Sequence, residues 1–133
     1  MKHIMVIILF LFTFGVFAGE LTYICEIKQI AELSDNGEII SNNIGDIYKS
    51  RVGNKFTIDR NTGDMIGLPF STKSYKTINV LDKGSKENSF KSIVLSHPPN
   101  MWVMYIQVKE FHKGKLKPFW GTEGGNLYSG LCE

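Results

Sequence analysis

The sequence predicts an all-β protein, an antiparallel meander of about eight strands that forms a small barrel or a sandwich. Three observations carry this prediction. Short runs rich in β-branched and aromatic residues recur along the chain, and glycine, asparagine and aspartate separate them. No long amphipathic helical pattern follows residue 19. The two cysteines stand near the ends of this region, so a disulfide between them would link the first strand to the last.

The first eighteen residues have the composition of a secretory signal peptide. Lys2 supplies a positive charge, residues 4–17 are almost all apolar, and Val16 and Ala18 are the small residues of a cleavage site. An uncleaved anchor is the alternative, but this apolar run is shorter than the ~20 residues that span a bilayer. We therefore expect cleavage after Ala18 and export to the periplasm or the cell exterior. One β domain would then cover residues 19–133.

The charges of the chain are almost balanced. It has 15 Lys and Arg against 13 Asp and Glu, and one of the basic residues belongs to the leader. No strong field favours nucleic acid or a membrane surface as partner. No second apolar run of spanning length follows the leader. We expect a monomer without a membrane span, whose partner is a protein, a small molecule or a glycolipid.

Cys25 and Cys132 are expected to form a disulfide, the default for two cysteines in an exported protein. Closing so long a loop would stabilise the fold by about 4 to 5 kcal/mol. The alternative is a redox-active or nucleophilic cysteine, which usually has a CxxC spacing or a clear histidine partner. Neither feature is apparent in this sequence.

The first strand is expected over residues 21–33, because Leu21, Tyr23, Cys25 and Ile27 fall on one face. A turn at residues 36–37 and a weaker strand at 38–41 follow. Residues 42–54 are expected to form a loop with a short strand or a helical turn. The further strands are expected at residues 55–60, 64–68, 75–82, 89–96, 102–111, 117–122 and 126–133.

Two of these strands have a predicted inner face. Phe56 and Ile58 should point inward from residues 55–60. In residues 102–111, the stripe of alternate apolar side chains is expected to be core, with Tyr105 and Gln107 on the other face. The members of this stripe are Trp102, Met104, Ile106 and Val108.

The stretch FTIDRNTGDMIG, residues 56–67, resembles a calcium-binding loop because Asp59, Asn61 and Asp64 stand close together around Gly63. An EF-hand loop needs glycine at position 6 and glutamate at position 12. Counted from Asp59, the glycine stands at position 5 and Phe70 takes position 12. We expect a hairpin turn with no metal, in which Gly63 adopts positive φ.

Arg60 and Asp64 flank this turn and would be able to pair across it. A surface pair of this kind contributes about 0 to 1 kcal/mol, so a solvated hairpin end is the simplest interpretation. The alternative is a recognition loop presented to a partner.

The stretch VKEFHKGKLKPFW is the best candidate for a binding surface. Basic residues interleaved with aromatics can hold a polyanion, or the sugars and phosphates of an envelope glycolipid. Lysines on a hairpin or an edge strand also promote solubility and prevent edge pairing, which is the alternative interpretation. The candidate residues are Lys109, His112, Lys113, Lys115, Lys117 and Trp120.

No coherent catalytic set is visible. The sequence contains no HExxH, CxxC or GxSxG motif, and His97 and His112 lie in predicted turns. We assign no catalytic residue, metal or cofactor, and favour a non-catalytic ligand- or protein-binding domain. One alternative is a small periplasmic hydrolase that uses either histidine with an acid such as Asp59 or Glu123. Another is a structural component of the cell envelope.

Four segments carry a resemblance across nearly the whole chain after the leader. They read IDRNTGDMIG, LDKGSKENSF, VKEF and YSGLCE, and an early cysteine precedes them. In these segments the chain resembles a group of small, exported, uncharacterised bacterial β-proteins. The resemblance implies an exported bacterial protein and brings no activity with it.

Overall fold

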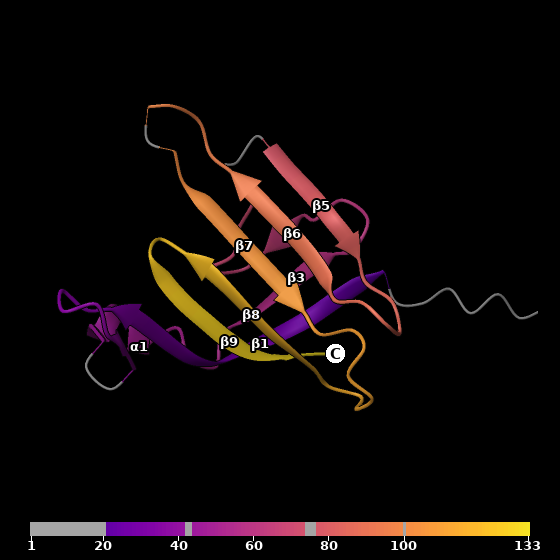
Figure 1. Cartoon of the computed structure of the whole chain (residues 1–133), viewed down its shortest axis with the longest axis horizontal. Coiled ribbons are helices and arrows are strands. Elements are labelled where there is room, and N and C mark those ends of the chain that lie inside the picture. Colours follow the sequence, from indigo (N-terminus) through magenta and orange to yellow (C-terminus); the bar gives the residue numbers. More distant parts are fainter. Residues whose placement is uncertain (1–20, 42–43, 74–76, 100) are drawn as a thin grey trace, which may run out of the picture.

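The computed structural model describes residues 21–41, 44–73, 77–99 and 101–133, and it shows an antiparallel β protein (Figure 1). The predicted leader, residues 1–18, lies outside the described residues. Among these described ranges, the elements are β1 (Thr22–Leu33), β2 (Ile39–Ile40), α1 (Asp46–Lys49), β3 (Lys55–Asp59), β4 (Met65–Ile66), β5 (Thr77–Lys83), β6 (Phe90–Leu95), β7 (Val103–Val108), β8 (Lys117–Glu123) and β9 (Asn126–Cys132).

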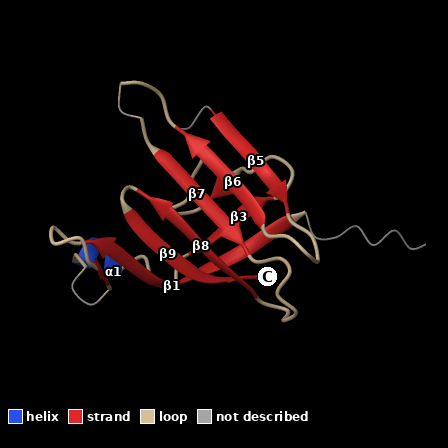
Figure 2. Cartoon of the chain, in the orientation of Figure 1, coloured by secondary structure: helices blue, strands red, loops and turns tan. Residues whose placement is uncertain are grey.

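All strands belong to one sheet that curls into a half-barrel. The strand order is β4-β3-β1-β9-β8-β7-β6-β5, and β2 pairs with β1 beside this path. From β5 to β9 the strands follow one another as a meander, and β1 then pairs with β9 (Figure 1). The predicted all-β class is thus confirmed. The predicted helical turn within residues 42–54 is present as α1, the short blue segment in Figure 2.

The first and last strands are neighbours, as the positions of the cysteines predicted. β1 and β9 pair antiparallel, and Cys25 lies directly opposite Cys132 in their register. The two residues form a disulfide and are fully buried. The covalent link therefore joins the start of β1 to the end of β9.

The side-chain alternation of β1 holds over its first half and then shifts. Tyr23, Cys25 and Ile27 are buried, whereas Leu21 precedes the strand and is exposed. An irregularity between Ile27 and Gln29 changes the register with β9. Such a bulge moves the buried face by one residue, so that the next buried side chain is Ile30.

The concave face of the half-barrel is filled by aromatic side chains. Phe70, from the segment after β4, lies 4.8 Å from Phe56 and 5.2 Å from Tyr128 between ring centroids. Phe119 lies 5.3 Å from Phe56 on another side. Rings at such spacings, mostly edge to face, pack favourably. These four rings join β3, β8 and β9 into one core.

The turn between β3 and β4 packs against β5 and β6, at the far end of the strand order. At Gly63 an added Cβ would lie 2.7 Å from Ile78 Cγ2 and 2.8 Å from Ser92 Oγ. Gly63 also has a φ of 76°, which favours glycine. The turn thus closes the open side of the half-barrel by side-chain packing.

The prediction that Trp102 belongs to the core is wrong. Met104, Ile106 and Val108 are buried on the inner face of β7, but Trp102 is 48% exposed. It precedes β7, which starts at Val103, so the alternation of the strand does not fix its direction. The Trp102 ring lies near Gly124, in the turn between β8 and β9.

Candidate functional site

Arg60 brings together segments that are far apart in the sequence. Its guanidinium donates hydrogen bonds to the carbonyl oxygens of Lys83 at 3.1 Å and Gly84 at 3.5 Å. It also lies 3.7 Å from the carboxylate of Glu110 and 5.0 Å from the centroid of the Tyr23 ring. The β3–β4 turn, β1 and the segments after β5 and β7 therefore meet at one end of the half-barrel. We call this the Arg60 end.

The local structure of the β3–β4 turn fixes where Arg60 points. The Asp59 carboxylate accepts hydrogen bonds from the backbone N–H groups of Asn61 at 2.8 Å and Thr62 at 2.9 Å. These N–H groups, that of Thr62 first, hold the pKa of Asp59 below its ordinary value. Asn61 in addition accepts a hydrogen bond from the Lys83 ammonium at 3.3 Å. The predicted hairpin with positive φ at Gly63 is present.

The acidic side chains of this turn are engaged with the protein itself. One carboxylate oxygen of Asp59 accepts a backbone hydrogen bond within its own turn. The Asp64 carboxylate accepts a hydrogen bond from Thr72 at 3.4 Å. Within the described ranges, no group of three or more His, Cys, Asp or Glu side chains is placed to hold a metal ion. The structure thus assigns Asp59 a structural position within the turn.

Tyr23 and Glu110 form a short polar contact at the Arg60 end. The phenol donates a hydrogen bond to the Glu110 carboxylate at 2.6 Å. Burial, followed by this hydrogen bond, raises the pKa of Tyr23. The ring of Tyr23 also packs edge-on against Phe90 at 5.6 Å. Tyr23 thus connects the charged cluster to the apolar core.

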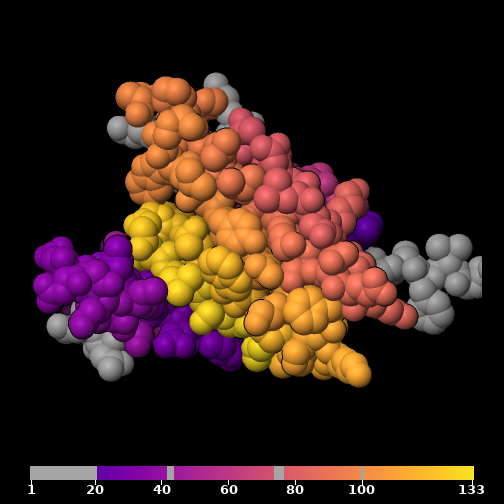
Figure 3. Space-filling model, viewed as in Figure 1, coloured from indigo at the N-terminus to yellow at the C-terminus, as the bar shows by residue number. Residues whose placement is uncertain are grey.

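A cleft of 200 Å³ opens beside this cluster. It contains three basic side chains, two acidic ones, a threonine and a tyrosine. Its lining consists of Thr22, Tyr23, Arg60, Glu110, Lys115, Lys117 and Glu133. Figure 3 shows the segment after β7, in orange, beside the segment that joins β5 and β6.

The two lysines of the cleft differ in how firmly they are held. The Lys115 ammonium lies 4.0 Å from the Glu133 carboxylate, and its side chain is 88% exposed. A pair at this distance in water is weak. Lys117 is half-buried and donates a hydrogen bond to the backbone oxygen of His112. Lys115 can therefore move to an incoming anion, whereas Lys117 is already oriented by the loop.

The six residues of the predicted basic surface are divided among the cleft, the loop after β7 and the outer face of β8. Lys115 and Lys117 line the cleft, whereas Lys109, His112 and Lys113 are exposed on the loop and do not line it. Trp120 lies on the outer face of β8, because Phe119 before it points into the core. The cleft therefore contains two of the six residues, Lys115 and Lys117, and Trp120 does not line it.

Trp120 belongs to a different cluster, on the outer face of β7 and β8. Its indole N–H donates a hydrogen bond to the Gln107 side chain at 3.2 Å, and its ring lies 5.1 Å from that of Tyr105. Tyr105 donates to the same Gln107 oxygen at 3.2 Å. The Gln107 amide in turn donates to Ser89 at 2.9 Å. Cross-strand contacts of this kind stabilise the sheet.

The opposite end of the half-barrel holds a second arginine cluster. Arg51 donates a hydrogen bond to the Tyr128 hydroxyl at 2.6 Å and lies 3.5 Å from the Glu123 carboxylate. Its guanidinium also stacks on the ring of Tyr48, 5.1 Å from the centroid. Tyr48 comes from α1, so this cluster joins the helix to β8 and β9. We call this the Arg51 end.

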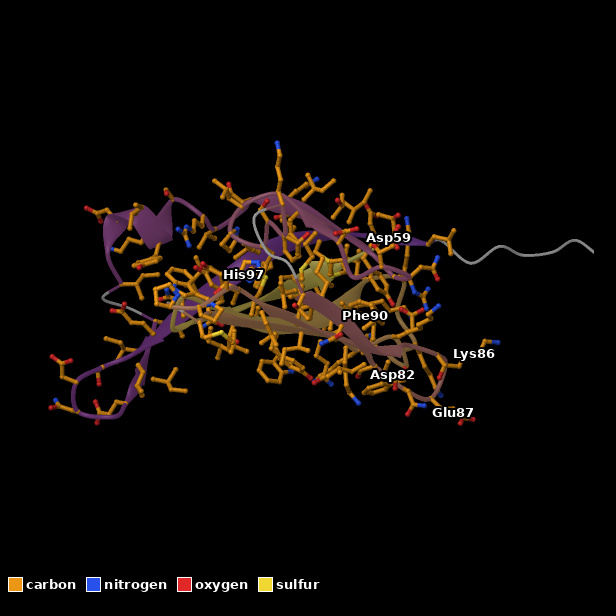
Figure 4. All side chains as sticks on the ribbon, turned by 90° about the horizontal axis from the view of Figure 1, so that it is seen from above. Asp59, Asp82, Lys86, Glu87, Phe90 and His97 are labelled. Carbon is orange, nitrogen blue, oxygen red and sulfur yellow. A yellow bond between two sulfur atoms is a disulfide. The ribbon has the colours of Figure 1, made fainter. Side chains whose placement is uncertain are left out.

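The two histidines outside the leader lie far from each other. His97 follows β6 and His112 follows β7, and both are exposed. Since β6 and β7 are antiparallel neighbours, these positions are at opposite ends of the sheet. Figure 4 shows His97 well away from Asp59, Asp82, Lys86 and Glu87. Glu123, the other candidate acid, is paired with Arg51.

Tyr23, Glu110 and Glu133 line the cleft, and the sequence did not indicate any of them. Tyr23 and Glu110 lie in segments that were interpreted as strand, and only the fold places them beside Arg60. The segments IDRNTGDMIG, LDKGSKENSF, VKEF and YSGLCE include Arg60, Lys83, Glu110 and Glu133. All four lie at the Arg60 end.

No family model matches the chain, and no curated protein or solved structure matches it. In the part of the chain that the structure describes, no helix is long and apolar enough to cross a membrane. The chemistry of the Arg60 end is therefore the basis for a function.

Proposed function

We propose that the chain is an exported bacterial binding domain without catalysis, and that the cleft at the Arg60 end holds the anionic group of its ligand. The observation that carries the proposal is the meeting of Arg60, Lys115 and Lys117 around one small cleft. Guanidinium and ammonium groups hold phosphate and carboxylate oxygens through charge-assisted hydrogen bonds. A volume of 200 Å³ suits one such group rather than a large ligand.

The two acidic residues of the cleft do not balance its three basic side chains, so positive charge remains for a ligand. Glu110 accepts a hydrogen bond from Tyr23 on one carboxylate oxygen, and Arg60 lies 3.7 Å from the other oxygen. The Glu133 carboxylate lies 4.0 Å from the Lys115 ammonium, which is a long contact. An anion that entered the cleft would displace weak contacts and gain stronger ones. Its binding would therefore be favourable, although modest.

Two observations support export and a role without catalysis. A buried disulfide is consistent with an oxidising compartment such as the periplasm or the cell exterior. The two histidines considered for hydrolysis lie at opposite ends of the sheet and do not line the cleft. General acid–base catalysis requires such groups within hydrogen-bond reach of the substrate.

Titration calorimetry with glycerol 3-phosphate tests the proposal. We expect saturable binding with a Kd on the order of 1 mM, which corresponds to a binding free energy of about −4 kcal/mol. Lys115→Ala and Lys117→Ala should each weaken binding several-fold. Lys49→Ala is the matched control, because Lys49 is an exposed lysine at the Arg51 end. Neutral glycerol should not bind.

Absence of saturable binding to the native protein would contradict the proposal. Equal binding by all three variants would contradict it as well, because the cleft would then not be the site. Release of inorganic phosphate during the titration would favour the hydrolase alternative instead.

A further inference from the structure

Glu133 differs from the other side chains of the cleft because its backbone is fixed while its carboxylate is exposed. Its backbone N–H and carbonyl oxygen form two hydrogen bonds with the backbone of Ile24, at 2.9 Å each. The residue before it, Cys132, is fully buried in the disulfide with Cys25. The side chain of Glu133 is nevertheless 51% exposed, and it lines the cleft. The fold therefore holds a carboxylate beside the lysines that would bind the anion of the ligand.

The two carboxylates of the cleft differ in the contacts that they make. Glu110 accepts a hydrogen bond from Tyr23 on one oxygen at 2.6 Å, and Arg60 lies 3.7 Å from the other oxygen. The side chain of Glu110 is only 20% exposed. Glu133 lies 4.0 Å from the ammonium of Lys115, whose side chain is 88% exposed. A contact of this length between exposed groups contributes little. Glu133 is thus the acidic side chain that a ligand can engage.

The lining of the cleft carries only a small excess of positive charge. Arg60, Lys115 and Lys117 are opposed by Glu110 and Glu133, which leaves one positive charge. A phosphate monoester carries a charge of about −1.5 to −2 at neutral pH, so a phosphate alone would exceed this excess. An ammonium group on the same ligand would bring its net charge to about −0.5 to −1. A ligand with both groups therefore matches the charge of the lining.

We propose that the ligand of the cleft is a zwitterionic phosphate monoester, with an ammonium group a few bonds from the phosphate. Lys115 and Lys117 hold the phosphate through charge-assisted hydrogen bonds, and Glu133 accepts hydrogen bonds from the ammonium group. Lys115 leaves Glu133 for the phosphate, and the ammonium group of the ligand takes its place beside that carboxylate. The inference rests on the proposed function, because the basic side chains must bind the anion.

The register of β8 and β9 sets the distance between the two charged groups of the ligand. Lys117 lies directly opposite Cys132, so Glu133 is one residue beyond that pair. Neighbouring strands are about 4.8 Å apart. A phosphate at Lys117 and an ammonium group at Glu133 are then separated by about the width of one strand pair. Only a few bonds join two groups at this spacing, as in phosphoethanolamine.

An amino acid is a poorer ligand for this cleft, although it also carries an anion and an ammonium group. Its net charge is close to zero at neutral pH, so the positive excess of the lining would remain. A carboxylate also offers two acceptor oxygens, whereas a phosphate offers three. The cleft has two lysines and one arginine, and a phosphate can engage more of these donors at once.

Calorimetric titrations of residues 19–133 with two isosteric phosphates test the inference. Phosphoethanolamine carries the ammonium group, and propyl phosphate has a methyl group in the same place. We expect phosphoethanolamine to bind about fivefold more tightly at neutral pH and low salt, the upper range for an exposed ion pair. Glu133→Gln should make the two affinities equal, because the amide keeps the size of the side chain and loses its charge. Glu38→Gln is the control variant, since Glu38 is an exposed acid between β1 and β2. It should keep the preference.

The outcomes separate this inference from the proposed function. Equal affinities of the native protein for the two phosphates would overturn the inference and leave the anion-binding cleft intact. A preference for phosphoethanolamine that Glu133→Gln retains, or that Glu38→Gln also loses, would overturn it as well. Phosphoethanolamine binding that Lys115→Ala and Lys117→Ala leave unchanged would contradict both, because the phosphate would then lie outside the cleft. Absence of binding by these two phosphates and by glycerol 3-phosphate would likewise contradict both.

Discussion

The two ends of the half-barrel use the same three kinds of side chain in different ways. Both ends hold an arginine from a loop, a glutamate and a buried tyrosine. The sets are Arg60, Glu110 and Tyr23 at one end, and Arg51, Glu123 and Tyr128 at the other. The two arginines are exposed to a similar extent, 21% and 23% of their side chains. Burial alone therefore does not distinguish the two ends.

The direction of the tyrosine hydrogen bond distinguishes them. At the Arg51 end, Tyr128 accepts a hydrogen bond from the arginine, and the glutamate lies 3.5 Å from the same guanidinium. At the Arg60 end, Tyr23 donates to one oxygen of Glu110, and Arg60 lies 3.7 Å from the other oxygen. At the Arg51 end, the arginine is thus paired with both the tyrosine and the glutamate. The Arg60 end, which also has two lysines in its cleft, keeps basic capacity for a ligand.

Removal of the disulfide should destabilise the protein most, with a larger effect at the Arg60 end than at the Arg51 end. The double variant Cys25→Ser, Cys132→Ser should lower the free energy of unfolding by about 4 to 5 kcal/mol, because the bond closes a long loop. Chemical denaturation checks the loss. Cys25 lies two residues from Tyr23, so hydrogen exchange should increase more at the Arg60 end than around Arg51. An unchanged denaturation curve would contradict the structural role of the bond.

Gly63→Ala should have the next largest effect, about 3 kcal/mol, because positive φ and a close contact both oppose a side chain. Gly53→Ala is the matched control near the Arg51 end. Gly53 has a similar φ of 86°, but nothing lies within 4 Å of its added Cβ. It should lose only about 1 kcal/mol. Equal losses in thermal melts would mean that the β3–β4 turn does not close the half-barrel by packing.

Replacing the two arginines compares the ends directly. Arg60→Met and Arg51→Met should each destabilise the fold by about 2 kcal/mol, since each removes hydrogen bonds to a charged group. Only Arg60→Met should also abolish binding of glycerol 3-phosphate. Calorimetry on both variants, below their melting temperatures, checks this difference. Loss of binding in Arg51→Met alone would reverse the assignment of the two ends.

Acid should affect the β3–β4 turn through Asp59, and this effect is the smallest. Its folded pKa is lowered by backbone N–H groups, so its contribution is present above the unfolded value of about 3.9 and is lost as pH falls below it. Asp59→Asn keeps an oxygen that accepts these N–H groups but does not titrate. The melting temperature of this variant should therefore fall less between about pH 4 and pH 2. An equal fall in melting temperature for both proteins would contradict this role of Asp59.

Most of the fold follows from local sequence patterns. The alternation in β1, β3 and β7 predicted the buried side chains at Tyr23, Phe56 and Ile106. Cys25 and Cys132 predicted that β1 and β9 are neighbours, because a disulfide between them requires the two strands to lie side by side. The prediction that Trp102 is buried was wrong, since the alternation of a strand does not fix the direction of a residue just before it.

The candidate site was predictable only in part. Sequence reasoning identified Arg60 and the lysine-rich loop, but as two separate surfaces. Their meeting depends on the curl of the whole sheet, which packs Gly63 against Ile78 and brings Arg60 to the carbonyl group of Lys83. No local pattern encodes a contact between strands that do not pair. Trp120 was grouped with the lysines because it is close in sequence, although β8 directs it to the outer face.

The central claim is that the Arg60 end binds an anion and the Arg51 end does not. An NMR titration of ¹⁵N-labelled residues 19–133 with glycerol 3-phosphate is the first experiment. We expect saturable shifts at the backbone amides of Thr22, Lys115 and Lys117, with those of Arg51 and Glu123 unmoved. Shifts centred on Arg51 and Glu123, or no saturable shifts at all, would contradict it.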